Sequence, residues 1–387
     1  MALKRIVGIC IILGISVSGA AVVQRRYAED LRHQLGQRLN ELHQELDAIS
    51  HRRPPAGSSE EAGKEGFAWD EYQRALDLLA ERSSHALTAL SIKAVEAASL
   101  NPQERFETAT QLSANLEEEI RCLREGASRL DATPKDRVEA DGTSHLPKLI
   151  TAKIITNALA LQGIAAVEAR NPRGGANMIL DAMQLGQDFT RSRFLLTQII
   201  GSSVLLPDAL KVYLENNPLE GLGPEALERL DEGIIKLIQA APRTPELRGE
   251  FGLFQERLDT IGIKIAASTA RQTLSMLDWV DHERAENALE TVHNLQQRSE
   301  QAVLGGLQRQ YFSGCLSSVI QVRHCTVQLH MLHAAIREVR GLQPEPFQEP
   351  FGMPLQTEEE GNPRVLVVHA PEGISAAPVR LRLASPR

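Results

Sequence analysis

The chain has 387 residues, of which 42% are hydrophobic and 4% aromatic, and its formal net charge is −8. This length allows one large domain with flanking pieces. Because Leu, Ala and Ile supply most of the apolar residues, the composition favours packed helices over sheets. The acidic charge, with no recurring basic stripe, argues against a nucleic-acid partner.

An uncharged apolar run over residues 6–23 follows a short basic head. Its length reaches the lower end of what a membrane-spanning helix needs. The run predicts a signal anchor over residues 1–24, with cleavage after Ala20 as the alternative. We therefore expect a single-pass protein of the bacterial inner membrane, held by residues 6–23, with the bulk of the chain on the extracytoplasmic side.

Residues 25–52 carry one apolar stripe at spacings of three and four, which predicts an amphipathic, coiled-coil-like stalk. The stripe would either associate with a second chain or pack on its own domain. The next segment, 53–66, combines Pro, Gly, Ser and charge without an apolar period and predicts a flexible linker. The stripe consists of Tyr27, Leu31, Leu35, Leu39, Leu42, Leu46 and Ile49.

Residues 67–340 show helical periodicity and predict a mainly α fold, an irregular α-helical bundle or array. Helix starts are marked by a capping residue before proline at Asn101, Gly223 and Thr244. A helical hairpin is expected around the turn NPRGG at 171–175. It resembles one tetratricopeptide unit in outline, but no second copy follows at a fixed period.

Residues 341–387 form a Pro- and Gly-rich tail in which a helix is excluded over most of the length. Val365–His369 and Val379–Leu383 are β-prone runs that predict a small hairpin. A two-stranded hairpin is marginal by itself, so it must lie on the helical body or on a partner.

Two pairs of side chains are the only candidates for a metal or catalytic site. Glu290 and His293 form an ExxH pair on one helix face, and His330 and His333 lie one turn apart. The chain has no second ExxH, so surface and core roles explain both pairs, and we expect neither a metal nor a cofactor. Common hydrolase, NTPase and dehydrogenase motifs are absent, and no catalytic residue can be named.

Four other residues invite structural hypotheses. Arg248 lies beside a glycine and is expected to form a structural ion pair. Cys122, Cys315 and Cys325 remain outside the apolar run. They could include one disulfide or serve as small buried apolar residues, and the second interpretation is favoured.

The layout of anchor, linker, helical body and tail resembles that of single-anchor α-helical envelope proteins of bacteria that have no established activity. The stretch EPFGMPLQ at 349–356 resembles the DPWGNPY-type stretch near the end of secretion-system pseudopilins. This chain lacks the N-terminal processing motif of pseudopilins and has Glu349 where they have Asp. The likeness implies a shared kind of C-terminal β-loop.

These observations predict a non-enzymatic envelope protein with an exported helical scaffold or protein-binding domain. Its partners would be the membrane and a protein, or a second copy bound through the stalk. The alternative is a helical-bundle metal protein or enzyme that uses the four candidate residues.

Overall fold

The computed structural model describes residues 2–49, 51–57, 64–97, 100–134, 149–216, 219, 222–242, 246–248, 271, 273–278, 288–301, 305–343, 349–358, 365–374 and 376–383. Side chains are described from residue 24 onward. The chain divides into two compact units. We call Met1–Ile49, Val138–Ser144 and Arg248–Arg284 the stalk unit, and Ser50–Arg137, His145–Leu247 and Ala285–Arg387 the body unit.

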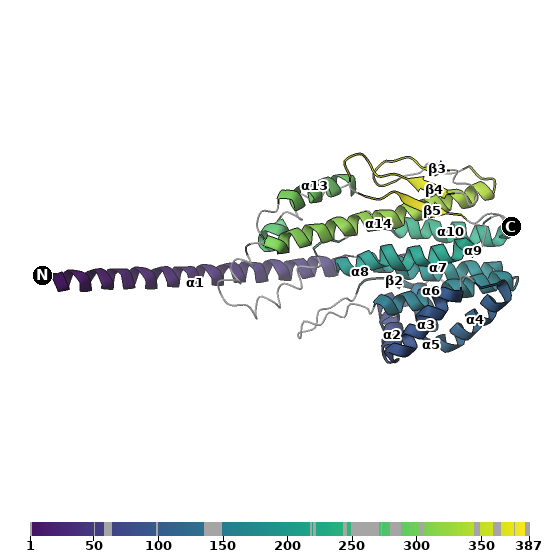
Figure 1. The fold of residues 1–387 in the computed structure, drawn as a ribbon, viewed down its shortest axis with the longest axis horizontal. Helices are drawn as coiled ribbons and strands as arrows, with labels where there is room; N and C mark the ends of the chain where they lie inside the picture. Colours follow the sequence, from purple (N-terminus) through teal and green to yellow (C-terminus); the bar gives the residue numbers. More distant parts are fainter. Residues whose placement is uncertain are drawn as a thin grey trace. The chain divides into compact units, whose positions relative to one another are not determined.

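The described residues are mainly helical with a few short strands, which confirms the prediction of a mainly α fold (Figure 1). The helices are α1 (Ala2–Ala48), α2 (Ala68–Ala80), α3 (Ser84–Ala97), α4 (Pro102–Asn115), α5 (Glu117–Ser128), α6 (Leu149–Glu168), α7 (Pro172–Phe189), α8 (Leu195–Ile200), the π-helical turn η1 (Gly201–Leu205), α9 (Leu206–Asn216), α10 (Pro224–Ala240), α13 (Ala288–Gln301) and α14 (Gly305–Val339). The strands are β1 (Lys64–Phe67), β2 (Arg129–Asp131), β3 (Gln356–Glu358), β4 (Val365–Val368) and β5 (Val379–Arg382).

The body unit is built in layers around α6 and α7 (Figure 1). Helix α6 packs on α4, α7 and α9, and α7 also packs on α5 and α10. Helix α14 lies on α10 and carries the small C-terminal sheet on its other side. One apolar core runs from α2 through these helices to β4 and β5.

Two of the predicted helix starts are present, and both have proline in the first turn. Asn101 caps α4, its side chain accepting a hydrogen bond from the Glu104 N–H, and α10 begins directly after Gly223. The predicted start at Thr244 lies outside the described residues. The predicted hairpin is α6 and α7, and its turn passes through Arg170, whose φ of 62° is rarely adopted by a side-chain-bearing residue.

The C-terminal tail carries a three-stranded antiparallel sheet of order β3-β4-β5. The pairing of β4 with β5 confirms the predicted hairpin, and β3 adds a third strand. Val379 and Leu381 of β5 are buried in the main core, whereas the alternate residues Arg380 and Arg382 are exposed. The sheet therefore packs on the helical body, mainly on α14.

The EPFG stretch that resembles pseudopilin tails is a tight turn fixed to α14. The Glu349 carboxylate accepts hydrogen bonds from the Phe351 and Met353 N–H groups, and Gly352 has a φ of 78°. Arg323 of α14 pairs with Glu349, both side chains being fully buried, and its guanidinium lies 4.2 Å from the Phe351 ring centroid. A buried charge pair therefore holds this turn against α14.

The segment predicted as a flexible linker, 53–66, differs from that expectation in its first part. Arg53 and Ala56 are buried, and Arg53 forms a fully buried ion pair with Asp188 of α7. Burial disfavours the charge of Arg53, but the attraction of Asp188 outweighs it and raises the Arg53 pKa above its usual value. Residues 58–63 lie outside the described residues, and Lys64–Phe67 pairs with β2.

Within the stalk unit, α1 buries the leucines of its apolar stripe, with Leu35 and Leu39 fully inaccessible. Arg248 Nη1 lies 2.7 Å from Glu45 Oε2, which is the ion pair expected of Arg248. Arg271 donates a hydrogen bond of 2.9 Å to the Tyr27 hydroxyl. The leucines of the stripe are thus buried within the stalk unit, whereas Tyr27 and Ile49 near its two ends are exposed.

The side chains of the predicted anchor, residues 6–23, lie outside those that the structure describes. In the part of the chain that is described, no helix is long and apolar enough to cross a membrane. Cys122, Cys315 and Cys325 are free and buried, as the favoured interpretation of the cysteines requires.

We predict that Arg53→Met lowers the free energy of unfolding by about 3–5 kcal/mol, because it leaves Asp188 as an unpaired buried charge. Urea unfolding followed by circular dichroism measures this change. The neighbouring Arg52 forms an exposed pair with Glu65, so Arg52→Met should cost no more than about 0.5 kcal/mol. Equal losses in the two variants would contradict the role assigned to the buried pair.

Candidate functional site

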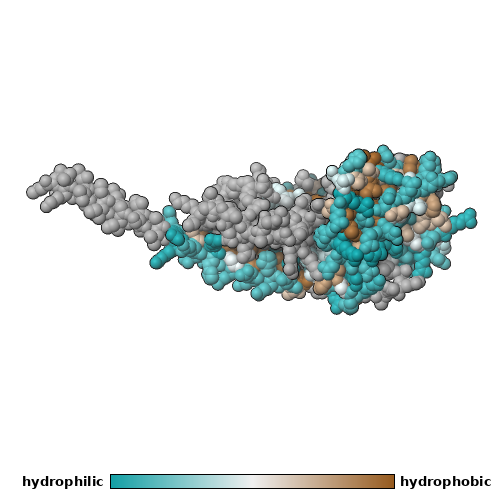
Figure 2. Space-filling view, turned by 90° about the horizontal axis from the view of Figure 1, so that it is seen from below, coloured by the Kyte–Doolittle hydropathy of each residue, from teal (hydrophilic) through white to brown (hydrophobic). Residues whose placement is uncertain are grey.

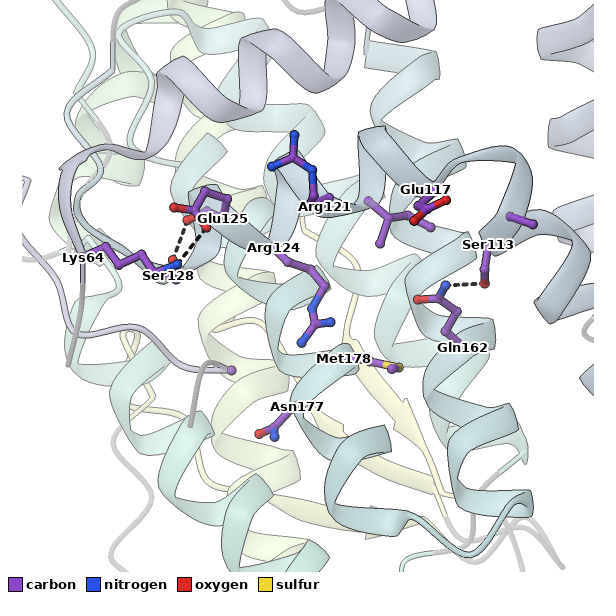
Figure 3. A pocket seen from close by; sticks show the side chains of 13 residues that line it. Lys64, Ser113, Glu117, Arg121, Arg124, Glu125, Ser128, Gln162, Asn177 and Met178 are labelled. Carbon is purple, nitrogen blue, oxygen red and sulfur yellow. Dashed lines mark hydrogen bonds and ion pairs between the residues drawn. The ribbon is translucent and has the colours of Figure 1, made fainter. Parts of the chain in front are cut away.

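An open groove of about 670 Å³ in the body unit is a candidate site among the described residues. Its walls come from α4 and α5 on one side and from α6 and α7 on the other, and Gly57 and Lys64 close one end (Figure 3). Figure 2 looks at the body unit from the α2–α5 side and shows a mainly hydrophilic surface. The groove is therefore open to solvent, and its lining mixes charged and polar side chains with the apolar side chains of Ile120 and Met178.

Most charged side chains in the groove already have a partner of opposite sign. Lys64 Nζ lies 3.0 Å from Glu125 Oε2, and Arg121 pairs with Glu118 at 2.5 Å. The exposed Glu117 has no ion-pair partner among the residues that the structure describes. The groove therefore presents ion pairs and, among the described residues, the carboxylate of Glu117 without an ion-pair partner.

Arg124 extends from α5 toward α7, as Figure 3 shows, and its Nε donates a hydrogen bond of 3.0 Å to Asp181 Oδ2. The Asp181 side chain is buried, whereas that of Arg124 is 46% exposed. Burial, opposed by the attraction of Arg124, raises the pKa of Asp181 to about 6. The other oxygen, Oδ1, accepts no hydrogen bond from any described group.

Gly57 explains why Asp181 Oδ1 is closed off. A Cβ at this glycine would lie 2.0 Å from Oδ1, so only the glycine backbone fits against the carboxylate. Arg229 of α10 holds the same stretch of chain, because its Nη2 donates to the Ala56 carbonyl and its Nε donates to Asn177 Oδ1 at 2.6 Å. The end of the groove is thus fixed by buried polar contacts.

The groove can bind groups by charge and hydrogen bonding, but it holds no activated nucleophile. The Ser113 hydroxyl donates to the Ala109 carbonyl at 2.6 Å, and the Ser128 hydroxyl donates to the Glu125 carbonyl at 2.7 Å. Gln162 donates in turn to the Ser113 hydroxyl. Neither hydroxyl is hydrogen-bonded to a general base, which nucleophilic catalysis by serine requires.

The structure places the residues predicted from sequence elsewhere. Glu290 and His293 are exposed on one face of α13, and His330 of α14 is half-buried, with a pKa lowered by burial and by His333. His333 is buried, with its Nε2 3.1 Å from Asp231 Oδ1 of α10 but without hydrogen-bond geometry. Across the described ranges, no three His, Cys, Asp or Glu side chains are arranged to hold a metal ion.

Sequence reasoning missed every residue of the groove. The lining comes from residues 57 and 64 and from four helices, and only α5 contributes a whole helical face, which runs from Glu117 to Ser128. Gly57 carried a usable signal, because a glycine within a Pro-rich stretch often marks a close backbone approach. No such signal marked Asp181, because a single acidic residue in an apolar helix is usually assigned to the solvent-facing side of that helix.

Comparison of the chain with protein-family models, curated proteins and solved structures finds no match.

We predict a pH-dependent effect of Asp181→Asn on stability. The folded pKa of Asp181, about 6, lies above the usual value of 3.8, so folding disfavours the charged form. The contribution of Asp181 to stability is full below pH 3.8 and is lost as the pH rises through 6. Asparagine does not titrate, so the variant should gain on the order of 2–3 kcal/mol relative to wild type between pH 4 and pH 7.

Urea unfolding of both proteins at pH 4, 5, 6 and 7 checks this prediction. Burial also lowers the pKa of His51 and of His324 to about 4, which destabilises both proteins alike at low pH and cancels in the difference. A difference in stability that stays constant over this range would refute the perturbed titration of Asp181.

Proposed function

We propose that the protein is a membrane-anchored envelope protein whose body unit is a non-enzymatic scaffold, and that the groove between α4–α5 and α6–α7 binds a protein partner. The observation that carries the proposal is the groove itself: an open depression of about 670 Å³ whose lining carries charges of both signs.

The chemistry of the groove suits an extended polypeptide better than a small molecule. Small-molecule sites are usually concave and apolar and bury most of the ligand. Here the floor and walls offer Arg124, Lys64 and the free Glu117 at separate points along an open surface. A chain with charges in a complementary order would meet them one after another, and such charge patterns set specificity more than affinity.

The rigidity of the walls also supports a binding role. The buried contacts of Arg53 and Arg229 hold residues 53–57 in place before any partner arrives. A surface formed in advance loses less conformational entropy on binding. A non-enzymatic role is supported by the serine hydroxyls, which donate to main-chain carbonyls.

We propose the anchor and the exported location on the strength of residues 1–24 alone. The basic head and the apolar run after it are the features typical of an export signal.

The groove is tested by photo-crosslinking in intact cells. A photoreactive amino acid at Ala114, which is exposed in the groove, should give a discrete adduct with a partner. The same amino acid at Ala89, which is exposed on α3 outside the groove, should not. Arg121→Glu should reduce the Ala114 adduct at least fivefold, because it reverses one charge of the lining. Equal adducts at the two positions, or none at Ala114, would refute the proposal.

The anchor is tested by protease treatment of intact spheroplasts that express the full chain with a C-terminal tag, followed by membrane fractionation. We expect the tag to be degraded from outside and a fragment with residues 6–23 to remain in the membrane. A soluble exported chain that begins near Ala21 would show that the run is removed. A protected, membrane-bound tag would place the body unit in the cytoplasm.

A further inference from the structure

A second, smaller cleft of about 380 Å³ lies between α9, α14 and the strands β4 and β5. Its elements are different from those of the groove, and all of them belong to the body unit. This volume is near the lower end of small-molecule and peptide-anchor pockets, which run from about 300 to 1,000 Å³. The cleft can therefore hold one or two residues of a peptide.

The rim of the cleft is basic, although the chain as a whole is acidic. Lys211 of α9 and Arg380 and Arg382 of β5 line it, and all three are exposed. The one acidic side chain in the lining is Asp208, which lies 2.5 Å from Lys153 Nζ. Lys211 and Arg382 have no ion-pair partner among the described residues, so their charges are available to an anion.

The floor of the cleft is apolar. Leu210, Val365 and Leu381 line it, and each is no more than 4% exposed. Gln328 of α14 also lines the cleft, and its Nε2 donates to the Arg380 carbonyl at 3.4 Å. That contact leaves Oε1 as a buried acceptor without a hydrogen bond from any described donor. The floor of the cleft can therefore take an apolar side chain.

We propose that this cleft binds the C-terminus of a polypeptide that ends in an aliphatic residue. The α-carboxylate would meet Lys211 and Arg382, and the terminal side chain would rest on Leu210 and Leu381. Capture of a C-terminal carboxylate is a recurring mode of peptide recognition. The proposal concerns a different face from the groove, so the crosslinking result at Ala114 does not decide it.

A plain anion fits the cleft less well than a peptide terminus. Inorganic phosphate would satisfy the basic rim but would leave Leu210 and Leu381 uncovered. An uncharged apolar group would cover the floor but leave the rim unused. A peptide C-terminus brings an anion and an apolar side chain in one unit.

The test is isothermal titration of the full chain in nanodiscs of zwitterionic lipid, with the peptide acetyl-Ala-Ala-Leu as the probe. We expect one site, with affinity for the free carboxylate at least tenfold higher than for the same peptide with a C-terminal amide. Acetyl-Ala-Ala-Asp should bind at least fivefold more weakly than the leucine peptide, because its side chain cannot rest on the apolar floor. Raising the salt concentration should weaken binding of the carboxylate form.

Matched variants locate the site. Lys211→Gln with Arg382→Gln should lower the affinity at least tenfold, whereas Lys93→Gln with Arg173→Gln, which removes the same charge outside the cleft, should leave it within twofold. Circular dichroism shows whether both double variants are folded. Equal binding of the carboxylate and amide peptides, equal binding of inorganic phosphate, or an unchanged affinity in the Lys211 and Arg382 variant would each overturn the proposal.

Discussion

The body unit depends on one buried charge pair, Arg53 with Asp188. Removing two charges from water costs several kcal/mol for each ion, so the pair is tolerated only when every polar atom finds a partner. The Arg53 guanidinium donates to Asp188 and also to the carbonyls of Ala127 and Arg129, at 3.0 and 2.7 Å. Tyr72 donates to the same carboxylate at 2.7 Å. One guanidinium thereby joins the segment after the stalk to α2, to α7 and to the C-terminal end of α5, where main-chain carbonyls lack helical partners.

The groove follows from that arrangement. Because Arg53 is fixed, the residues that follow it lie against α7, where the Ala56 carbonyl meets Arg229 and Gly57 meets Asp181. The chain therefore forms one end of the groove, and the carboxylate beneath it is kept away from water. A protein that recognises partners through paired charges benefits from such fixed positions, since mobile charged side chains lose entropy on binding that offsets much of their attraction.

Local patterns were sufficient for much of the fold. Capping residues before proline located the starts of α4 and α10, and short β-prone runs located β4 and β5, because these signals act within a few residues. The buried pair could not be found in this way. Arg53 lies in a stretch of charge, proline and glycine that is typical of solvated linkers, and its partner is 135 positions away. Burial of an arginine is decided by the acceptors around it, and these come from three distant segments. The groove and the basic cleft could not be predicted for the same reason, because their residues meet only in the folded chain.

The C-terminal tail is also attached to the helices through a buried arginine–carboxylate pair. Composition marks residues 341–387 as irregular, yet Arg323 and Glu349 are fully buried against each other, and β5 enters the main core. Two segments that composition assigns to loops are thus attached to the helices by a buried arginine pair. Arg53 attaches the first segment to α7, and Arg323 of α14 attaches the C-terminal tail. An arginine suits this role because it stays charged at every physiological pH and presents five donors in a rigid plane. Both candidate binding surfaces are bordered by the segments so attached, the groove by residues 56 and 57 and the cleft by β4 and β5. The buried arginine pairs therefore determine the shape of those surfaces as well as the stability of the fold.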